Sequence, residues 1–172
     1  MTRALIGIDV GGTTTSGCLV TGTGEVLSVL QTATHREGPG TAVETVLGLV
    51  GELVTEADRR PVTLAGVGVG IPGVVDPRTG AMRSLPNLVP ELSDVPLAER
   101  IHAKTGLPAF VDNDVNALAL AEWTFGLARN AGSLVVLAVG TGVGGGIIVD
   151  GHLVRGHRGC GGEWGHVSVN FN

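Results

Sequence analysis

The chain has 172 residues, of which 43% are hydrophobic, and this is enough for one domain or two small ones with a real core. Its formal net charge is −5 and it has no basic run, which argues against nucleic acid as the main partner, because phosphate backbones are bound by clustered Lys and Arg. A phosphorylated small molecule held by backbone amides is not excluded.

The cysteines and apolar runs indicate the compartment. Cys18 and Cys160 lie far apart and in no metal-like spacing, which fits a reducing cytoplasm. The apolar runs have the length of strands, too short for a signal peptide or a membrane span. We therefore expect a cytoplasmic protein with no membrane partner.

Short apolar runs rich in β-branched residues and bounded by turn residues predict strands. They occupy residues 4–10, 15–21, 25–32, 64–71, a run that ends at Val111, 134–139 and 147–149. The 29 glycines lie between such runs. Tight turns and close approach to a ligand therefore explain them better than a flexible linker does. A short partner strand is expected to begin at Gly151.

Three segments are predicted to be helices, the first from the helical spacing of its apolar residues. The first runs from Thr41 to Arg59, with Thr41 as the N-cap and Glu44 completing a capping box. The second starts at residue 93 or 94 and continues through residue 104, before a glycine and a proline. The third follows the polar residues after Val111.

The predicted order of elements is βββαβαβαββ, which indicates an α/β architecture with a mixed sheet and flanking helices. A change in composition near residues 112–130 predicts a boundary, so we expect domains of residues 1–111 and 112–172. The sequence contains one internal similarity: a strand–DVGGTT–strand pattern near the start resembles a later strand–GTGVGGG–strand pattern.

The loop after the first strand reads DVGGTT. Gly11 and Gly12 let backbone amides point into one concavity for anionic oxygens, and Thr13 and Thr14 add hydroxyl donors. Asp9 would then lie beside the phosphates, where a carboxylate can hold a hydrated Mg²⁺. The alternative is a tight turn in which Asp9 bonds its own backbone.

The second glycine loop, GTGVGGG, begins at Gly140, Thr141 and Gly142. It is not a Walker loop, because no Gly-Lys-Ser/Thr follows, and it is not a Rossmann fingerprint, because a strand follows it. A hairpin turn needs fewer glycines, so a phosphate-facing loop explains the surplus better. A bulged hairpin remains the alternative.

Four short polar side chains crowd the next junction, where Asp112, Asn113, Asp114 and Asn116 separate a strand from a helix. A helix start needs one capping oxygen, not four candidates. A carboxylate there could also accept a proton from a substrate hydroxyl, as phosphoryl transfer requires. Capping plus a turn is the alternative.

Near the end of the chain, Glu163-Trp164-Gly165-His166 carries two polar side chains around a glycine. Glu163 and His166 suit recognition of vicinal hydroxyls, because both form strong directional hydrogen bonds. A metal role for His166 is the alternative, although no second ligand of suitable spacing follows it.

Six motifs occur in one order: D-x-G-G-T, I-P-G, L-P-N-L, D-N-D-V-N, G-T-G-V-G-G-G-I and G-G-E-W-G-H. This combination resembles the ROK family, which groups repressors, open-reading-frame proteins and sugar kinases, and the match runs from Ile6 to His166. The resemblance implies an actin-like ATPase (ribonuclease H-like) fold with two domains and a cleft between them. It also implies a transferase that uses ATP and Mg²⁺ to phosphorylate a hexose, such as glucose, at the 6-hydroxyl.

The resemblance also implies roles for residues at matching positions. Asp114 would be the catalytic base, and Asn113 would bind sugar hydroxyls beside it. The two glycine loops would face the ATP phosphates, and Asp9 would face Mg²⁺. The residues implied to contact the sugar are Gly73, Asn87, Asn113, Asp114, Glu163 and His166.

The chain departs from the family pattern in several places. Thr14 replaces a common Lys, which weakens a basic contact at that position, and Gly161 replaces an Ala. The Cys-rich zinc segment of family kinases does not follow His166, so we expect no zinc here, and His166 would bind zinc only if that segment existed. We expect a truncated second domain, and hence an inactive, self-associating chain.

Two other functions stay open. A sugar-responsive ROK repressor would carry a helix-turn-helix ahead of the first strand, and this sequence shows none, which favours the kinase. A sugar-binding fragment without catalysis is the third reading, supported by the short length and opposed by the presence of Asp114.

Overall fold

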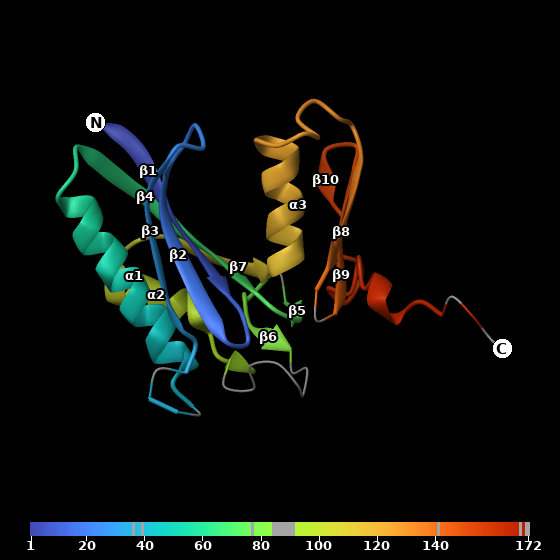
Figure 1. Cartoon of the computed structure of the whole chain (residues 1–172), viewed down its shortest axis with the longest axis horizontal. Helices are drawn as coiled ribbons and strands as arrows, with labels where there is room; N and C mark the ends of the chain where they lie inside the picture. Colours follow the sequence, from blue (N-terminus) through green and yellow to red (C-terminus); the bar gives the residue numbers. More distant parts are fainter. Residues whose placement is uncertain are drawn as a thin grey trace. The chain divides into compact units, whose positions relative to one another are not determined.

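The computed structural model describes residues 1–35, 37–38, 40–76, 78–83, 92–140, 142–168 and 170. It separates into two compact units, Met1–Asp114 and Val115–Asn172, whose elements are labelled in Figure 1. No helix in these residues is long and apolar enough to span a membrane.

The first unit is built on a five-stranded sheet with the order β3-β2-β1-β4-β7. β1 pairs antiparallel with β2 and parallel with β4, and β4 pairs parallel with β7, which makes the sheet mixed as predicted. The bounds are β1 Thr2–Val10, β2 Thr14–Thr21, β3 Val26–Ala33, β4 Val62–Ile71 and β7 Ala109–Asn113.

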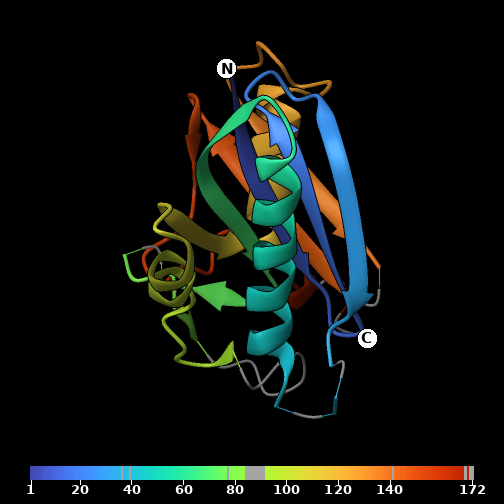
Figure 2. The ribbon, with the colours of Figure 1, turned by 90° about the vertical axis from the view of Figure 1, so that its left-hand side faces the viewer.

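Helices α1 (Ala42–Asp58) and α2 (Leu97–Thr105) pack with this sheet, and Figure 2 shows α1 lying across it. Alternate residues of β1 are buried with them in one apolar core, and residues between, such as Asp9, face the other side. Gly17 of β2 lies directly under α1, because a β-carbon there would come within 2.8 Å of Leu53. The strand ends that carry the candidate residues are therefore fixed by a packed core.

One predicted capping box and one predicted helix start are wrong. Thr41 has helical backbone angles and makes no side-chain cap; its hydroxyl donates to the Gly38 carbonyl at 2.7 Å, and Glu44 pairs with Arg100 at 2.8 Å. The capping box is therefore absent. The second helix begins at Leu97, not at residue 93 or 94, because Asp94 has a left-handed φ of 57° that a helix cannot continue through.

The second unit holds a three-stranded sheet with the order β10-β9-β8, together with most of α3 (Asp114–Thr124). The strands are β8 Leu134–Val139, β9 Val143–Val149 and β10 His152–Leu153, and the short 3₁₀ helix η2 spans Trp164–His166. β9 starts at Val143, four residues before the predicted start at residue 147. The last three glycines of GTGVGGG are consequently strand residues that pair with β8.

Close packing explains these strand glycines. A β-carbon on Gly144 would come within 2.7 Å of the Val115 side chain, and one on Gly146 within 2.6 Å of Ala119, so α3 lies against both positions. Gly145 lies against Trp164 of η2. We attributed the surplus of glycines in this motif to phosphate binding from the sequence. For these three residues, the structure shows that close packing requires glycine.

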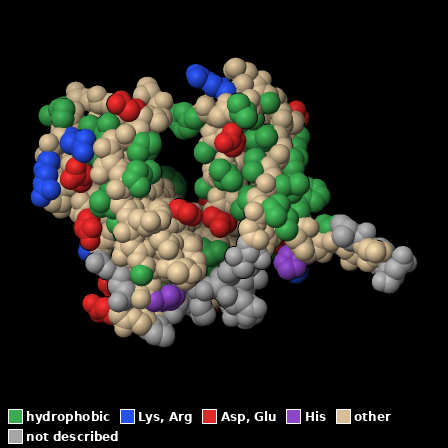
Figure 3. All heavy atoms as spheres, viewed as in Figure 1, with side chains coloured by type: hydrophobic (Ala, Val, Ile, Leu, Met, Phe, Trp, Pro, Cys, Tyr) green, Lys and Arg blue, Asp and Glu red, His purple; other side chains and the backbone are tan. Residues whose placement is uncertain are grey.

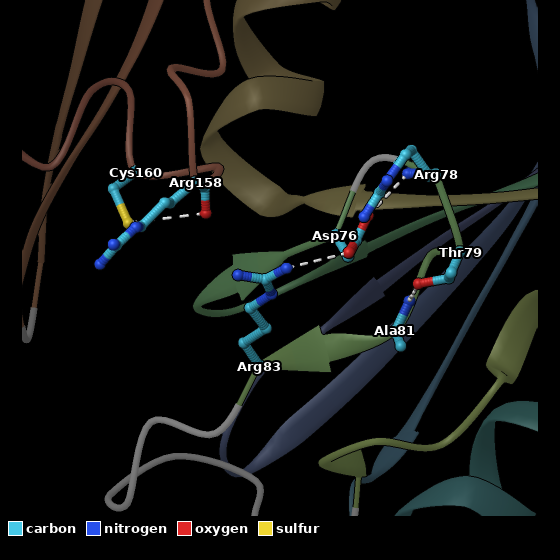
Figure 4. Close-up of polar contacts among 7 residues, drawn as sticks. All are labelled: Asp76, Arg78, Thr79, Ala81, Arg83, Arg158 and Cys160. Atoms are coloured by element: carbon cyan, nitrogen blue, oxygen red, sulfur yellow. Dashed lines mark hydrogen bonds and ion pairs between the residues drawn. The ribbon is translucent and has the colours of Figure 1, made fainter.

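A small hairpin, β5 (Val74–Val75) and β6 (Met82–Arg83), follows β4 in the first unit. Asp76 organises its turn: the carboxylate accepts the backbone N–H of Arg78 at 2.9 Å and the Arg83 guanidinium at 3.0 Å (Figure 4). These hydrogen bonds hold the pKa of Asp76 below its ordinary value, and the bond from the Arg78 amide has the largest effect. The carboxylate form therefore stabilises the hairpin.

This shift gives a pH dependence. The folded-state pKa is the lower one, so the contribution of Asp76 is present at neutral pH and is lost only as the pH falls through that lowered pKa. We expect an NMR titration of the Asp76 carboxyl to have a midpoint below about 3.9, the value of a free Asp. In Arg83→Gln the midpoint should rise but stay below that value, since the Arg78 amide remains. A midpoint at or above it in the wild type would contradict this account.

The outer edge of β8 is unpaired within the described sheet, and Val135, Leu137 and Val139 on it are exposed. Hydrophobic side chains gather at the surface over these strands in Figure 3. An open edge of this kind, long and without a charged residue, pairs readily with another chain.

We therefore expect the 172-residue chain to self-associate, with a mass above that of a monomer in light scattering. Val135→Lys places a charge on the β8 edge and should shift the chain toward the monomer. Leu127→Lys, at an exposed residue outside the strands, is the matched control and should change little. A monomeric wild-type chain would show that the edge is not used.

Candidate functional site

The junction between β7 and α3 brings three predicted sugar-site residues together. β7 ends at Asn113, α3 begins at Asp114, and the register pairs Ile71 at the end of β4 with Asn113. The Asn113 side-chain amide donates to the Gly73 carbonyl at 3.1 Å and to Asp114 Oδ1 at 2.9 Å. We call these residues the Gly73–Asn113–Asp114 cluster.

The cluster is half-buried, and its backbone suits its place. Gly73 has a φ of 93°, a left-handed conformation that glycine adopts without strain and that turns the chain directly after β4. Because Asn113 holds one carboxylate oxygen, the orientation of Asp114 is set by the ends of two parallel strands. A carboxylate fixed in this way can accept a proton from a hydroxyl placed beside it.

Asp9 lies at the end of β1, on the sheet face opposite the core. Partial withdrawal of its carboxyl from solvent raises its pKa above the ordinary value. The register places Asp9, Gly70 and Asp112 in one row across three strands, so Asp112 shares that face. No separate role for Asp112 was predicted, because this row of residues becomes visible only once the strands are paired.

The carboxylates of Asp9 and Asp112 are the groups to consider for a magnesium site on this face of the sheet. The described residues contain no group of three His, Cys, Asp or Glu side chains that could hold a metal by themselves. Mg²⁺ bound with a nucleotide needs only one or two carboxylates, since water and phosphate oxygens supply its other ligands. Asp9 therefore suits that role, and a resident zinc ion has no ligand set in the same part of the chain.

The turn from β1 to β2 comprises Gly11, Gly12 and Thr13, and a buried threonine outside it holds it in place. The hydroxyl of Thr34 donates to the Gly11 carbonyl at 2.6 Å, and its amide donates to the Thr13 carbonyl at 2.9 Å. Thr34 and Thr15 are both fully buried, with their hydroxyl oxygens 3.0 Å apart. Sequence reasoning missed Thr34, because its contact depends on the pairing of β2 with β3.

The turn from β8 to β9 is the second predicted phosphate loop. The Gly140 amide donates to the Gly142 carbonyl at 2.9 Å, while Thr141 lies outside the described residues. β-carbons on Gly12, Gly140 and Gly142 would each meet nothing within 4 Å, and none of the three has a left-handed φ. Packing and backbone strain in the described chain therefore do not require glycine at these positions.

In the second unit, Glu163 immediately precedes η2 and His166 ends it. Their side chains approach within 3.8 Å, Nε2 to Oε2, and His166 is 81% exposed against 33% for Glu163. The structure thus brings these two predicted sugar contacts together. Asn87, the remaining one, lies outside the described residues.

Both cysteines are free thiols. Cys18 lies on β2, where burial raises the pKa of its thiol. Cys160 is exposed, and its Sγ donates to the Arg158 carbonyl at 3.8 Å (Figure 4). The raised pKa of Cys18 argues against a catalytic thiol at that position, because reactive cysteines have a lowered pKa.

A model of the ROK family matches residues 5–172. The glucokinase of Thermotoga maritima is 38% identical over 171 residues, which are 98% of this chain and 51% of that protein. A ROK family glucokinase from Streptomyces griseus, solved in complex with glucose and AMPPNP, is 31% identical with a TM-score of 0.83. The alignment covers 97% of this chain and 51% of that one.

Regulators share the fold too. A ROK family transcriptional regulator, a homolog of the E. coli MLC protein, is 26% identical with a TM-score of 0.86, over 99% of this chain and 42% of that one. The chain thus spans about half the length of the curated kinases it matches. These structures confirm the predicted actin-like ATPase fold, with a mixed sheet and flanking helices. The chain belongs to the ROK family.

Proposed function

We propose that this chain is part of a cytoplasmic kinase that transfers the γ-phosphoryl group of ATP to the 6-hydroxyl of glucose or a related hexose. The observation that carries the proposal is the Gly73–Asn113–Asp114 cluster, in which a carboxylate at a helix start is held by a neighbouring amide. The similarity to glucokinases, one of them bound to glucose and AMPPNP, supports the substrate class.

In the proposed reaction, Asp114 orients the sugar hydroxyl and takes its proton as the phosphoryl group transfers. Asn113 keeps the carboxylate in place and binds a neighbouring hydroxyl. Glu163 and His166 bind further hydroxyls, and a carboxylate acceptor makes such hydrogen bonds strong. Gly73 and Asn87 are assigned to the wall of the same sugar site.

ATP is assigned to the two glycine turns, 11–14 and 140–142. Glycines that no packing contact requires, such as Gly12 and Gly142, fit turns whose backbone is approached by a ligand. Mg²⁺ is assigned to Asp9, where it would neutralise charge on the phosphate oxygens. Turn amides and one carboxylate would then hold the two parts of MgATP.

A sugar-responsive repressor is the second candidate, because a ROK regulator has the same fold over nearly the whole chain. Such a protein would bind the sugar without transferring phosphate. A coupled assay with the complete gene product, ATP, Mg²⁺ and a panel of hexoses separates the two. Sugar binding in calorimetry without any phosphorylated product would support the repressor and overturn the kinase.

Asp114→Asn tests the catalytic assignment. Loss of the base should lower kcat by about 10²- to 10⁴-fold, the usual contribution of general base catalysis. The KM for sugar should change far less, since Asn keeps the size and one hydrogen-bonding oxygen. Asp150→Asn, in the turn between β9 and β10, is the control. A kcat within a few-fold of the wild type would remove Asp114 from this role.

The two classes of glycine give a separate test of the ATP assignment. Gly12→Ala and Gly142→Ala should leave thermal stability unchanged but raise the KM for MgATP, because each β-carbon enters only the space assigned to phosphate. Gly146→Ala should instead destabilise the fold by about 1–3 kcal/mol through overpacking against α3. An unchanged KM for MgATP in both turn variants would move the phosphates elsewhere.

A further inference from the structure

The segment that carries Glu163 and His166 is interlocked with β9 through glycines. A β-carbon on Gly145 would overlap the Trp164 indole and come within 2.6 Å of the Gly162 carbonyl oxygen. A β-carbon on Gly165 would come within 2.5 Å of the Val143 carbonyl oxygen. Two stretches of backbone therefore touch, and the indole lies over Gly145, a strand position without a side chain.

The segment has little local structure to hold it otherwise. η2 is only three residues long. The amides of Trp164, His166 and Val167 donate to the carbonyls of Gly162, Glu163 and Trp164 at 2.7, 3.2 and 3.2 Å, respectively. Such a short 3₁₀ turn is not stable by itself. Contact with β9 is the further support that the structure shows, and Trp164, although 41% exposed, places its indole against Gly145 there.

In the described residues, the side chains of Glu163 and His166 make a polar contact only with each other, an approach of 3.8 Å. Trp164 stands between them in sequence, directly after Glu163. The directions of both side chains therefore follow from where the indole is anchored.

We infer that Trp164 and Gly145 are positioning residues for sugar recognition: Gly145 receives the indole, and the anchored indole fixes Glu163 and His166 for the sugar. The inference rests on the proposed function, which assigns those two side chains to sugar hydroxyls. It also gives Gly145, three residues beyond the turn assigned to ATP, a role toward the other substrate.

The kinetic test uses the complete gene product. Trp164→Ala removes the anchor without adding volume and should raise the KM for sugar by about 10- to 100-fold, as misplacement of binding groups does. Trp164→Phe keeps a flat apolar ring and should restore most of the sugar affinity. Gly145→Ala should act like Trp164→Ala, and Gly132→Ala, whose β-carbon meets nothing within 4 Å, is the matched control. The KM for MgATP should stay within about twofold of the wild-type value in all four variants, because none of them changes a residue assigned to MgATP.

Amide hydrogen exchange gives a readout that needs no sugar. The amides of Trp164, His166 and Val167 should exchange faster in Trp164→Ala and Gly145→Ala than in the wild type or Gly132→Ala. Unchanged exchange rates in Trp164→Ala and Gly145→Ala would contradict the claim that Trp164 anchors the η2 turn on Gly145. Faster exchange with an unchanged sugar KM would overturn the role in recognition. A wild-type protein that phosphorylates no sugar would defeat the proposed function instead, and the exchange experiment would still decide whether Trp164 anchors the turn.

Discussion

The side-chain amide of Asn113 joins the ends of β4 and β7 to the first residue of α3. Its two donors are used on Gly73 and Asp114, so a shift of either strand end would turn the carboxylate. The strand ends in turn are held by the parallel register and by the core beneath the sheet. The proposed chemistry depends on this chain of constraints, because a base must meet its hydroxyl within hydrogen-bonding distance.

Glycine serves this protein in two different ways. At Gly12, Gly140 and Gly142 the surroundings leave room for a side chain, so packing does not explain the residue type, and we propose that ligand approach does. At Gly145 and Gly146 the surroundings leave none, so the residue type is explained by packing against η2 and α3. One sequence motif, GTGVGGG, contains both kinds, so the single explanation by phosphate binding does not account for all of its glycines.

Local patterns predicted most of the fold. The strand positions followed from β-branched runs and the mixed sheet from the order of elements, and both are confirmed. The errors occur where a nonlocal contact decides the outcome. Thr41 bonds backwards to Gly38 instead of capping, and β9 extends through glycines because β8 pairs with them.

The candidate site shows the same division. The motifs pointed to Asn113, Asp114, Glu163 and His166 one by one, and the family resemblance supplied their roles, which stay predictions. The residues that support them were not predicted: Thr34 behind the first turn and Gly145 under Trp164 act through strand pairing and packing. Their local sequence carries no sign of these contacts.

The central claim is that the Gly73–Asn113–Asp114 cluster contacts the sugar. The most direct measurement is the NMR resonance of the Asn113 side-chain amide in the complete gene product, titrated with the hexose that it phosphorylates. The account predicts a shift of this resonance that saturates together with sugar binding measured by calorimetry. A resonance that stays in place while the protein is saturated with sugar would contradict it.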